Sequence, residues 1–294
     1  MANLKAIRIR ISSVKSTRQI TSAMKMVAAA KLRKAQDKIV RLRPYANKLH
    51  EILVILSQRI AEAETENVYS RSTPPEKILI VVITSNRGLC GAFNTNVIKE
   101  AKRVVEDNYY EQYKGGKVSF LAIGKKGFDY LRKQKYPLSG EYNDLFNDLT
   151  FENVSAVAEK VMTAFLTGEF DRVEIIYNHF KNAAIQQLRN ELFLPLESTP
   201  TEDKITQPAD YIYEPDKDSI IKELIPKSLK IQFYKAVLDS FVAENGARMT
   251  AMHKATDNAT TMISELTLQY NKARQAAITN QILEVVSGAE ALKG

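Results

Sequence analysis

The segment from Ile220 to Gly294 constrains the fold most, because its sequence predicts one very long helix. No proline follows Pro226 in this segment. At 1.5 Å per residue, the part after Pro226 would reach on the order of 100 Å, several times the width of a compact domain of this chain length. Such a helix needs a partner along its length.

Heptad spacing along this helix defines the face on which the partner would pack. About half of the residues on this face are small or polar. The face comprises Leu238, Phe241, Asn245, Arg248, Met252, Ala255, Ala259, Met262, Leu266, Gln269, Ala273 and Ala276. Small residues let two backbones approach closely but bury little area. We therefore expect the helix to hold one partner helix and to be weakly gripped on its other sides.

The first sixty residues have the same periodicity and predict the partner. Seam positions alternate at three and four residues: Leu4, Ile7, Ile11, Val14, Arg18, Thr21, Lys25, Ala28, Leu32, Ala35, Ile39, Leu42, Ala46, Leu49, Leu53, Leu56 and Ile60. Such a seam is typical of a coiled coil. Pro44 lies inside the pattern and predicts a kink that does not end the seam.

Three polar residues interrupt this N-terminal seam. They lie beside an alternative apolar set, Ile20, Met24 and Val27. Either the seam changes register at this point, or the segment faces something other than the partner helix.

The middle third of the chain predicts a small α/β domain. Strands are expected at Lys77–Thr84, Lys117–Ile123, Arg172–Tyr177 and, at the edge, Ile185–Leu194. Helices are expected at about Thr95–Asp107, with Asn94 as a possible cap, near Lys126–Gln134 and at Phe151–Leu166. Because strands and helices alternate, the sheet should be mainly parallel and the domain Rossmann-like.

Together these segments predict an antiparallel coiled coil of the two terminal helices with the α/β domain inserted between them. The expected boundaries are 1–65 for the first helix, 77–196 for the α/β domain, 197–219 for a linker and foot segment, and 220–294 for the last helix. The linker contains the cluster Tyr211–Asp216, whose tyrosines either pack in a local turn or form a contact surface.

The charge of +8 is unevenly distributed. Residues 1–43 carry twelve basic side chains and one acidic side chain, Asp37, and so have a net charge of +11. A block of this kind favours nucleic acid, an acidic membrane surface or acidic protein loops as partners. The alternative, a solvated helix face, usually mixes both signs.

Few features of the chain suggest an enzyme. The only cysteine is Cys90, and the three histidines have no ligand spacing, so no catalytic residue, cofactor or metal is expected. Gly88–Gly91 follows a strand as a phosphate loop would, but it lacks the phosphate-loop motifs. The loop at residues 84–91 could still present donors to an anion, or it could be a packing turn or partner contact. No apolar run reaches the ~20 residues of a membrane span.

Several motifs, in this order along the chain, resemble the γ subunit family of F-type ATP synthases, bacterial type. The first is Ile7-Arg8-x-Arg10-Ile11 through Met24-x-Met26-Val27-Ala28, and the second is Thr84-Ser85-x-Arg87-Gly88-Leu89-Cys90-Gly91. The terminal signature comprises Ala247–Asn258, Tyr270–Thr279 and Glu284–Ala289. The likeness covers essentially the whole chain; one departure is Gln281, where the family commonly has Glu.

This resemblance implies a non-catalytic rotor shaft that couples ion-driven rotation of a c-subunit ring to ATP synthesis in a hexamer of α and β subunits. It also implies a peripheral position at the cytoplasmic face of the bacterial inner membrane. The positions that match hexamer contacts are Met24, Lys25, Arg87, Cys90, Arg248, Arg274, Gln275 and Thr279. The positions that match contacts with the c ring and the ε subunit are Tyr211, Tyr213 and Glu214.

Two other classes of protein fit parts of the pattern. The basic N-terminal helix would suit a coiled-coil protein that binds nucleic acid, for which a steep salt dependence is expected. Against this, no RNA-binding aromatic signature accompanies the basic helix. A scaffold or adapter protein is the third reading.

Overall fold

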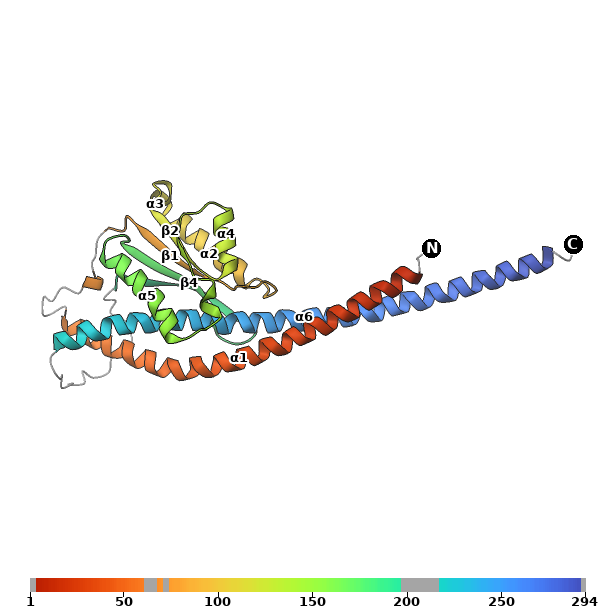
Figure 1. Cartoon of the computed structure of the whole chain (residues 1–294), viewed down its shortest axis with the longest axis horizontal. Coiled ribbons are helices and arrows are strands. Elements are labelled where there is room, and N and C mark those ends of the chain that lie inside the picture. The colour runs from red at the N-terminus through yellow and green to blue at the C-terminus, as the bar shows by residue number, and fades with distance from the viewer. Residues whose placement is uncertain (1–3, 61–67, 71–73, 197–216, 292–294) are drawn as a thin grey trace. The chain divides into compact units, whose positions relative to one another are not determined.

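The computed structural model describes residues 4–60, 68–70, 74–196 and 217–291. The chain divides into two compact units, one from Met1–Ala29 with Arg248–Gly294 and one from Ala30–Ala247. Two long helices, α1 (Leu4–Ile60) and α6 (Lys217–Ala291), contribute a segment to each unit (Figure 1). Both helices continue through an internal proline, Pro44 in α1 and Pro226 in α6.

In the first unit, the segments of α1 and α6 pair antiparallel, as predicted. Arg8 donates a hydrogen bond to the Tyr270 hydroxyl at 2.8 Å, and the Oγ1 atoms of Thr21 and Thr256 are 2.8 Å apart. Partner numbers therefore fall along α6 as they rise along α1. The predicted seam of α1 is the face that α6 covers, since every seam member from Leu4 to Ala28 is half-buried or buried.

The polar part of the α1 seam keeps the register of the apolar part. Thr21 is buried, whereas Ile20 and Val27 are 59% and 57% exposed. Both alternatives for this segment, a change of register and a face turned away from the partner helix, are therefore wrong. The helix pair is joined here by the threonine hydroxyls, which satisfy each other in a seam that buries little apolar area.

The seam of α6 departs from the prediction after Ala259. The predicted members Leu266 and Ala273 remain on the contact face, but Met262, Gln269 and Ala276 are exposed, and Ile263, Tyr270 and Ala277, each one residue later, are half-buried instead. The heptad repeat is kept, but its spacing after Ala259 runs four and three where three and four were predicted. Residues three and four positions apart lie on the same side of a helix, so periodicity alone does not decide between them. From Ile278 to Ala291, every residue is exposed.

The second unit contains a five-stranded sheet in the order β3-β2-β1-β4-β5. The strands are β1 (Ile78–Ile83), β2 (Val118–Ile123), β3 (Leu138–Glu141), β4 (Arg172–Phe180) and β5 (Gln186–Leu194). Only β5 is antiparallel, so the Rossmann-like, mainly parallel prediction is confirmed. Strand β3 has no counterpart among the predicted strands, because a four-residue strand containing glycine has little β signal.

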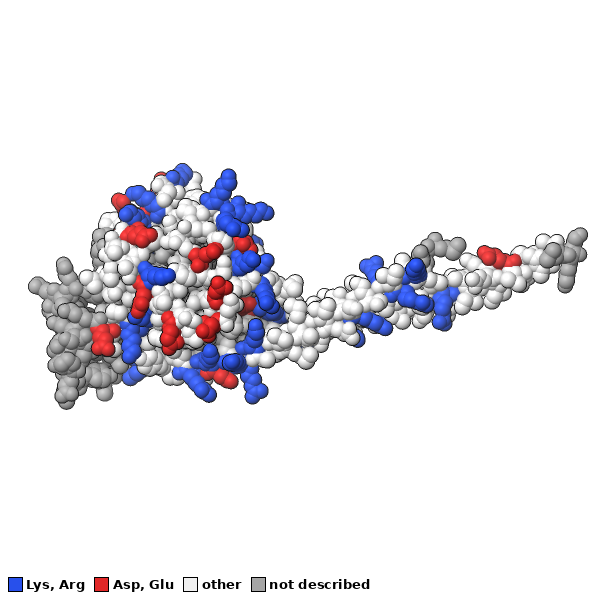
Figure 2. Space-filling model, viewed as in Figure 1, with Lys and Arg blue, Asp and Glu red and all other residues white. Residues whose placement is uncertain are grey.

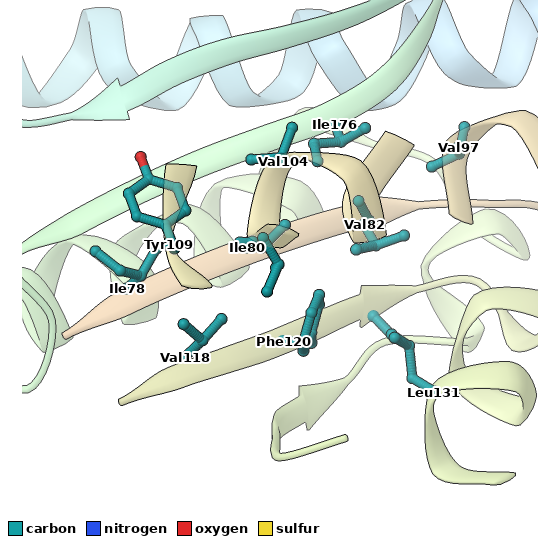
Figure 3. Packing of buried hydrophobic residues seen from close by; sticks show 13 residues of the cluster. Ile78, Ile80, Val82, Val97, Val104, Tyr109, Val118, Phe120, Leu131 and Ile176 are labelled. Atoms are coloured by element: carbon teal, nitrogen blue, oxygen red, sulfur yellow. The ribbon is translucent and has the colours of Figure 1, made fainter. Parts of the chain in front are cut away.

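The remaining elements of this unit surround the sheet. They are η1 (Val68–Ser70), α2 (Phe93–Asn108), α3 (Tyr110–Lys114), α4 (Lys125–Lys133), η2 (Asp144–Phe146) and α5 (Phe151–Leu166). All six residues of β1 are buried, as expected for a central strand covered on both faces. Figure 3 shows Ile78, Ile80 and Val82 of β1 packed with Val97 and Val104 of α2.

Within the second unit, α6 is buried on nearly every side. Between Leu229 and Ala247 almost all positions are buried or half-buried. Aromatic pairs join this segment to the α/β fold: Phe193 with Phe233, Phe151 with Tyr234, and Phe146 with Phe241. The expectation of a weakly gripped outer surface is therefore wrong for this part of α6, because the sheet and α5 contribute area that heptad spacing does not reveal.

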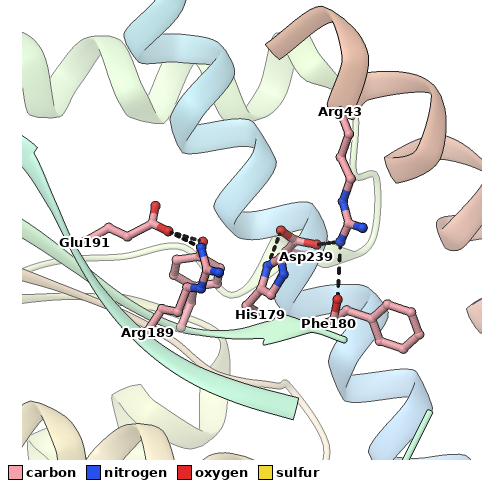
Figure 4. A network of polar contacts seen from close by, with 7 residues as sticks. Arg43, His179, Phe180, Arg189, Glu191 and Asp239 are labelled. Atoms are coloured by element: carbon pink, nitrogen blue, oxygen red, sulfur yellow. Dashed lines mark hydrogen bonds and ion pairs between the residues drawn. The ribbon is translucent and has the colours of Figure 1, made fainter. Parts of the chain in front are cut away.

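A buried carboxylate ties three elements of this unit together (Figure 4). Asp239 of α6 is 0% exposed, and it accepts hydrogen bonds from Arg43 of α1 at 3.1 Å and from His179 of β4 at 2.9 Å. The same Arg43 nitrogen donates to the Phe180 carbonyl at 3.2 Å. A buried carboxylate is tolerated only when it is paired, so these contacts fix how α1, α6 and β4 meet.

None of the helices described by the structure is long and apolar enough to cross a membrane.

Arg43→Met tests this network. We expect the free energy of unfolding to fall by about 2–3 kcal/mol, because Asp239 would stay buried with one partner fewer. The double variant Arg43→Met with Asp239→Asn should be less destabilised, since no unpaired charge remains. Arg33→Met, at an exposed position of α1, is the control and should change stability by less than about 0.5 kcal/mol. Urea titrations measure all three; purely additive losses would contradict the coupling.

The buried Tyr177 of β4 should make the free energy of unfolding fall at alkaline pH. Its hydroxyl donates to Glu191 at 2.7 Å, and burial, followed by the charge of Glu191, raises the pKa of Tyr177 above its usual range. The unfolded tyrosine ionises near pH 10, so its contribution is complete below about pH 10 and is lost as pH rises further. Tyr177→Phe should flatten the decline of unfolding free energy above pH 10 by about 1.4 kcal/mol per pH unit. Urea titrations between pH 8 and 11 measure the unfolding free energy of both proteins. An equal decline with pH in the parent and in Tyr177→Phe would contradict this assignment.

Candidate functional site

The loop at residues 84–91 is held in shape by its own polar side chains. Asn94, the second residue of α2, accepts hydrogen bonds from the Ser85 amide at 2.8 Å and hydroxyl at 3.1 Å. The Ser85 hydroxyl also lies 2.7 Å from the Arg87 carbonyl. The predicted capping role of Asn94 is therefore wrong: the residue before α2 is Ala92, and the Asn94 side chain holds the loop instead.

Asn86 fastens this loop to the neighbouring strand-to-helix connection. Its side chain accepts from the Lys125 amide at 3.0 Å and donates to the Asn143 carbonyl at 2.6 Å. Since Asn86 takes the first amide of α4 and Asn94 takes the amide of Ser85, the loop uses polar groups that an anion would need. The geometry favours a packing turn or partner contact over a phosphate site.

The two loop residues expected to contact a partner occupy different positions. Arg87 is exposed, whereas Cys90 is 1% exposed, with its sulfur 3.3 Å from the Asn94 side-chain nitrogen. Leu89, with a positive φ of 65°, is 65% exposed at the loop tip. The structure therefore presents Arg87 and Leu89 outward and places Cys90 beneath them; sequence analysis missed Leu89.

Glycines let the loop lie close to the start of α4. Gly124 has φ of 99°, and a Cβ added there would overlap the Thr84 carbonyl. The amide of Gly127 donates to Thr84 Oγ1 at 2.8 Å. The path of the loop as it leaves β1 thus depends on the absence of a side chain at Gly124.

Met24 and Lys25 lie together on the first unit. Both are half-buried on α1, and Lys25 Nζ is 3.4 Å from His253 Nδ1 of α6. The same imidazole nitrogen is 3.5 Å from Asp257. The arrangement forms a polar band across the helix pair, and Ile20 and Val27 of α1 expose large apolar side chains.

The C-terminal candidates lie on the α6 segment of the same unit. Arg248 is half-buried, and Arg274, Gln275 and Thr279 are exposed. Beyond them the helix exposes a run of large apolar side chains that sequence analysis missed: Ile278, Ile282, Leu283, Val285 and Val286. An exposed apolar surface of this kind marks a contact with another macromolecule. The antiparallel register is the signal that could have found it, because Arg8, near the start of α1, already pairs with Tyr270.

The remaining candidates, Tyr211, Tyr213 and Glu214, lie outside the described residues. In the part of the chain that the structure describes, no group of three His, Cys, Asp or Glu side chains could hold a metal ion. The described candidate residues lie on one loop of the second unit and on two helix segments of the first unit.

Comparison with known proteins gives one consistent result over the full length. The family model described as ATP synthase matches residues 3–292. The ATP synthase gamma chain of Flavobacterium johnsoniae is 57% identical over 295 residues, covering 100% of both chains. The gamma chain of Cytophaga hutchinsonii is 51% identical, covering 99% of both.

Solved structures agree with these relatives. A chain from the Euglena gracilis mitochondrial ATP synthase, in a structure of OSCP, F1 and the c-ring in rotational state 3, superposes with a TM-score of 0.72. It is 26% identical, and the match covers 98% of this chain and 94% of that one. A chain of the rotor in rotational state 1 matches with a TM-score of 0.67 at 25% identity, covering 94% and 98%.

The path of the loop at residues 84–91 can be tested at Gly124. Gly124→Ala should lower the free energy of unfolding by about 3 kcal/mol or more, because backbone strain adds to an overlap with the Thr84 carbonyl. Gly116→Ala is the matched control: its φ is 68°, and a Cβ there would meet nothing within 4 Å. Strain alone should cost this variant about 1 kcal/mol. Urea titrations measure both variants. An equal loss of unfolding free energy in Gly124→Ala and Gly116→Ala would show that the close approach of Gly124 to the Thr84 carbonyl does not affect stability.

Proposed function

The chain belongs to the ATP synthase gamma-chain family, and from this premise we propose that it is the central rotor shaft of an F-type ATP synthase. The full-length match to gamma chains is the observation that carries this conclusion. It is a non-catalytic subunit, and its function is to transmit rotation. The readings as a nucleic-acid-binding protein or a scaffold are not supported, since the relatives described above are gamma chains over their whole length.

In this role the chain couples two processes. Ion flow turns the c-subunit ring, the chain turns with it, and the α/β hexamer responds by making ATP from ADP and phosphate. Physically, the shaft is a ligand of the hexamer, and it can shift a catalytic site only through a difference in affinity between conformations. A shaft whose surface differs from side to side supplies such a difference.

The surface of the first unit supports this mechanism. Lys25, His253 and Asp257 form a polar band on the helix pair, whereas Ile20 and Ile282 expose apolar side chains. The surface of the pair is therefore chemically uneven. Opposite charges within about 10 Å are not fully screened at cellular salt, which suits acidic loops as partners of the basic side chains that α1 contributes to this unit, Lys5, Arg8, Arg10, Lys15, Arg18 and Lys25. The residues that would contact the hexamer here are Met24, Lys25, Arg248, Arg274, Gln275 and Thr279.

The loop at residues 84–91 would be a second contact with the hexamer. Exposed Arg87 would face an acidic loop directly, and buried Cys90 would act through the shape of the turn. At the foot, Tyr211, Tyr213 and Glu214 would contact the c ring and the ε subunit. The division into 1–65, 77–196, 197–219 and 220–294 is retained as part of this proposal, with 197–219 as the foot segment.

The partners determine the location of the chain. A shaft that rides on the c ring is a peripheral subunit of a membrane-bound complex. The bacterial relatives support the cytoplasmic face of the inner membrane as the site of assembly. No cofactor is required for this function.

Arg274→Ala with Gln275→Ala tests the hexamer contact. Because both side chains are exposed, the fold should be unaffected, while ion-driven ATP synthesis in reconstituted vesicles should fall. A loss of about 1.4 kcal/mol in differential contact energy corresponds to about a tenfold lower rate. Arg132→Ala with Gln134→Ala, exposed positions at the end of α4, is the matched control and should retain parental synthesis. Unchanged synthesis in the first variant would exclude the contact.

A further inference from the structure

The second unit contains a basic cavity that no contact of the rotor shaft described above uses. Its volume is about 290 Å³. It lies between α1, α6 and the segment that begins in η2. Its lining residues are Lys31, Lys34, Ala35 and Lys38 of α1, Phe146–Leu149 between β3 and α5, and Leu238 and Phe241 of α6.

Three ammonium groups form the rim of this cavity. Lys31, Lys34 and Lys38 are all exposed and follow one another at three and four residues along α1, so they share a face of the helix. Among the described residues, no carboxylate pairs with Lys31 or Lys34, and Lys38 is 3.5 Å from the Leu149 carbonyl. Figure 2 shows Lys and Arg side chains gathered on this unit where α1 runs.

Like charges at this spacing repel one another and destabilise a helix. Binding of an anion would relieve that repulsion. Lysine is a point charge that suits phosphate, since three donors on a flexible stem can follow its oxygens. The rim contains one carboxylate, Asp148, which accepts a hydrogen bond from the side-chain nitrogen of Asn153 at 3.2 Å. Three cations and one anion leave the rim positive.

The interior of the cavity has a different chemistry. Ala35 and Leu238 are buried and form an apolar floor. Phe146 and Phe241 form an aromatic wall, with ring centroids 5.9 Å apart and planes inclined by 15°. Both rings are only half-buried, so they retain surface on which a flat aromatic group can pack.

We propose that this cavity binds a nucleoside phosphate, with the base against Phe146 and Phe241 and the phosphate among Lys31, Lys34 and Lys38. The aromatic wall selects for a base, and the basic rim selects for the phosphate. The volume of about 290 Å³ is just below the usual range for small-molecule sites, so the cavity would enclose the base and leave the phosphate end in solvent. An acidic protein segment would need a longer groove than this cavity offers.

Equilibrium dialysis of the full-length chain with labelled ADP tests the site without any partner subunit. ADP should bind more tightly than inorganic phosphate, which lacks the base, and more tightly than adenosine, which lacks the charge. Higher salt should weaken ADP and phosphate binding and leave adenosine binding nearly unchanged. Because the chain is measured alone, the result is independent of its role as a rotor.

Substitutions separate the two halves of the site. Lys34→Gln with Lys38→Gln should raise the Kd of ADP about tenfold or more, as expected when charge-assisted hydrogen bonds are lost. Phe146→Leu should weaken ADP binding and leave phosphate binding unchanged. Lys99→Gln with Lys133→Gln, which removes two exposed lysines of α2 and α4, is the matched control and should bind ADP like the parent.

Three outcomes would overturn the proposal. The first is ADP binding that survives Lys34→Gln with Lys38→Gln, and the second is binding that the control weakens equally. The third is binding of a short polyglutamate peptide that ADP does not displace, which would assign the cavity to an acidic protein segment. Circular dichroism verifies the fold of each variant, and Lys31→Gln, which removes one exposed charge, replaces the double variant if that variant fails to fold.

Discussion

The pairing of α1 with α6 is the interaction on which the other features depend, because neither helix can bury its apolar face alone. In the first unit the pair is narrow, and its seam contains small and polar side chains such as Thr21 and Thr256. In the second unit the same two helices also meet the sheet, and α6 is enclosed. One helix therefore has two environments, and its function differs between them.

Because α6 is enclosed in the second unit, its buried polar residues need hydrogen-bond or charge partners. Asp239 is fully buried, so its pairing with Arg43 and His179 specifies how a strand and both helices meet. The aromatic contacts of Phe233, Tyr234 and Phe241 add area around this point. A rotor shaft transmits torque only if its parts hold a fixed geometry, and a paired buried charge resists displacement because separation would leave it unsolvated.

The last part of α6, from Ile278 to Ala291, is exposed, unlike the enclosed segment around Asp239. From Ile278 onward no part of α1 covers it, and large apolar side chains face outward there. Such a surface is unfavourable for a chain in water and is explained by a partner. The polar residues Arg274 and Gln275 lie where this uncovered segment begins, which places charged and apolar contacts side by side on the shaft.

Periodicity in the sequence determined the two long helices, their antiparallel pairing and the α/β insertion, since heptad spacing and β-branched runs are local properties. Burial depends on what else packs against a helix, so only the tertiary structure decided that α6 is enclosed near Asp239 and exposed beyond Ile278. The same holds for the shift of the α6 seam to Ile263 and Tyr270, for the role of Asn94 in holding the loop, and for the buried position of Cys90. Motifs identified Arg87 and Arg274 as candidates, but exposure of Leu89 and Val285 follows from the path of the chain in space, which no local pattern encodes.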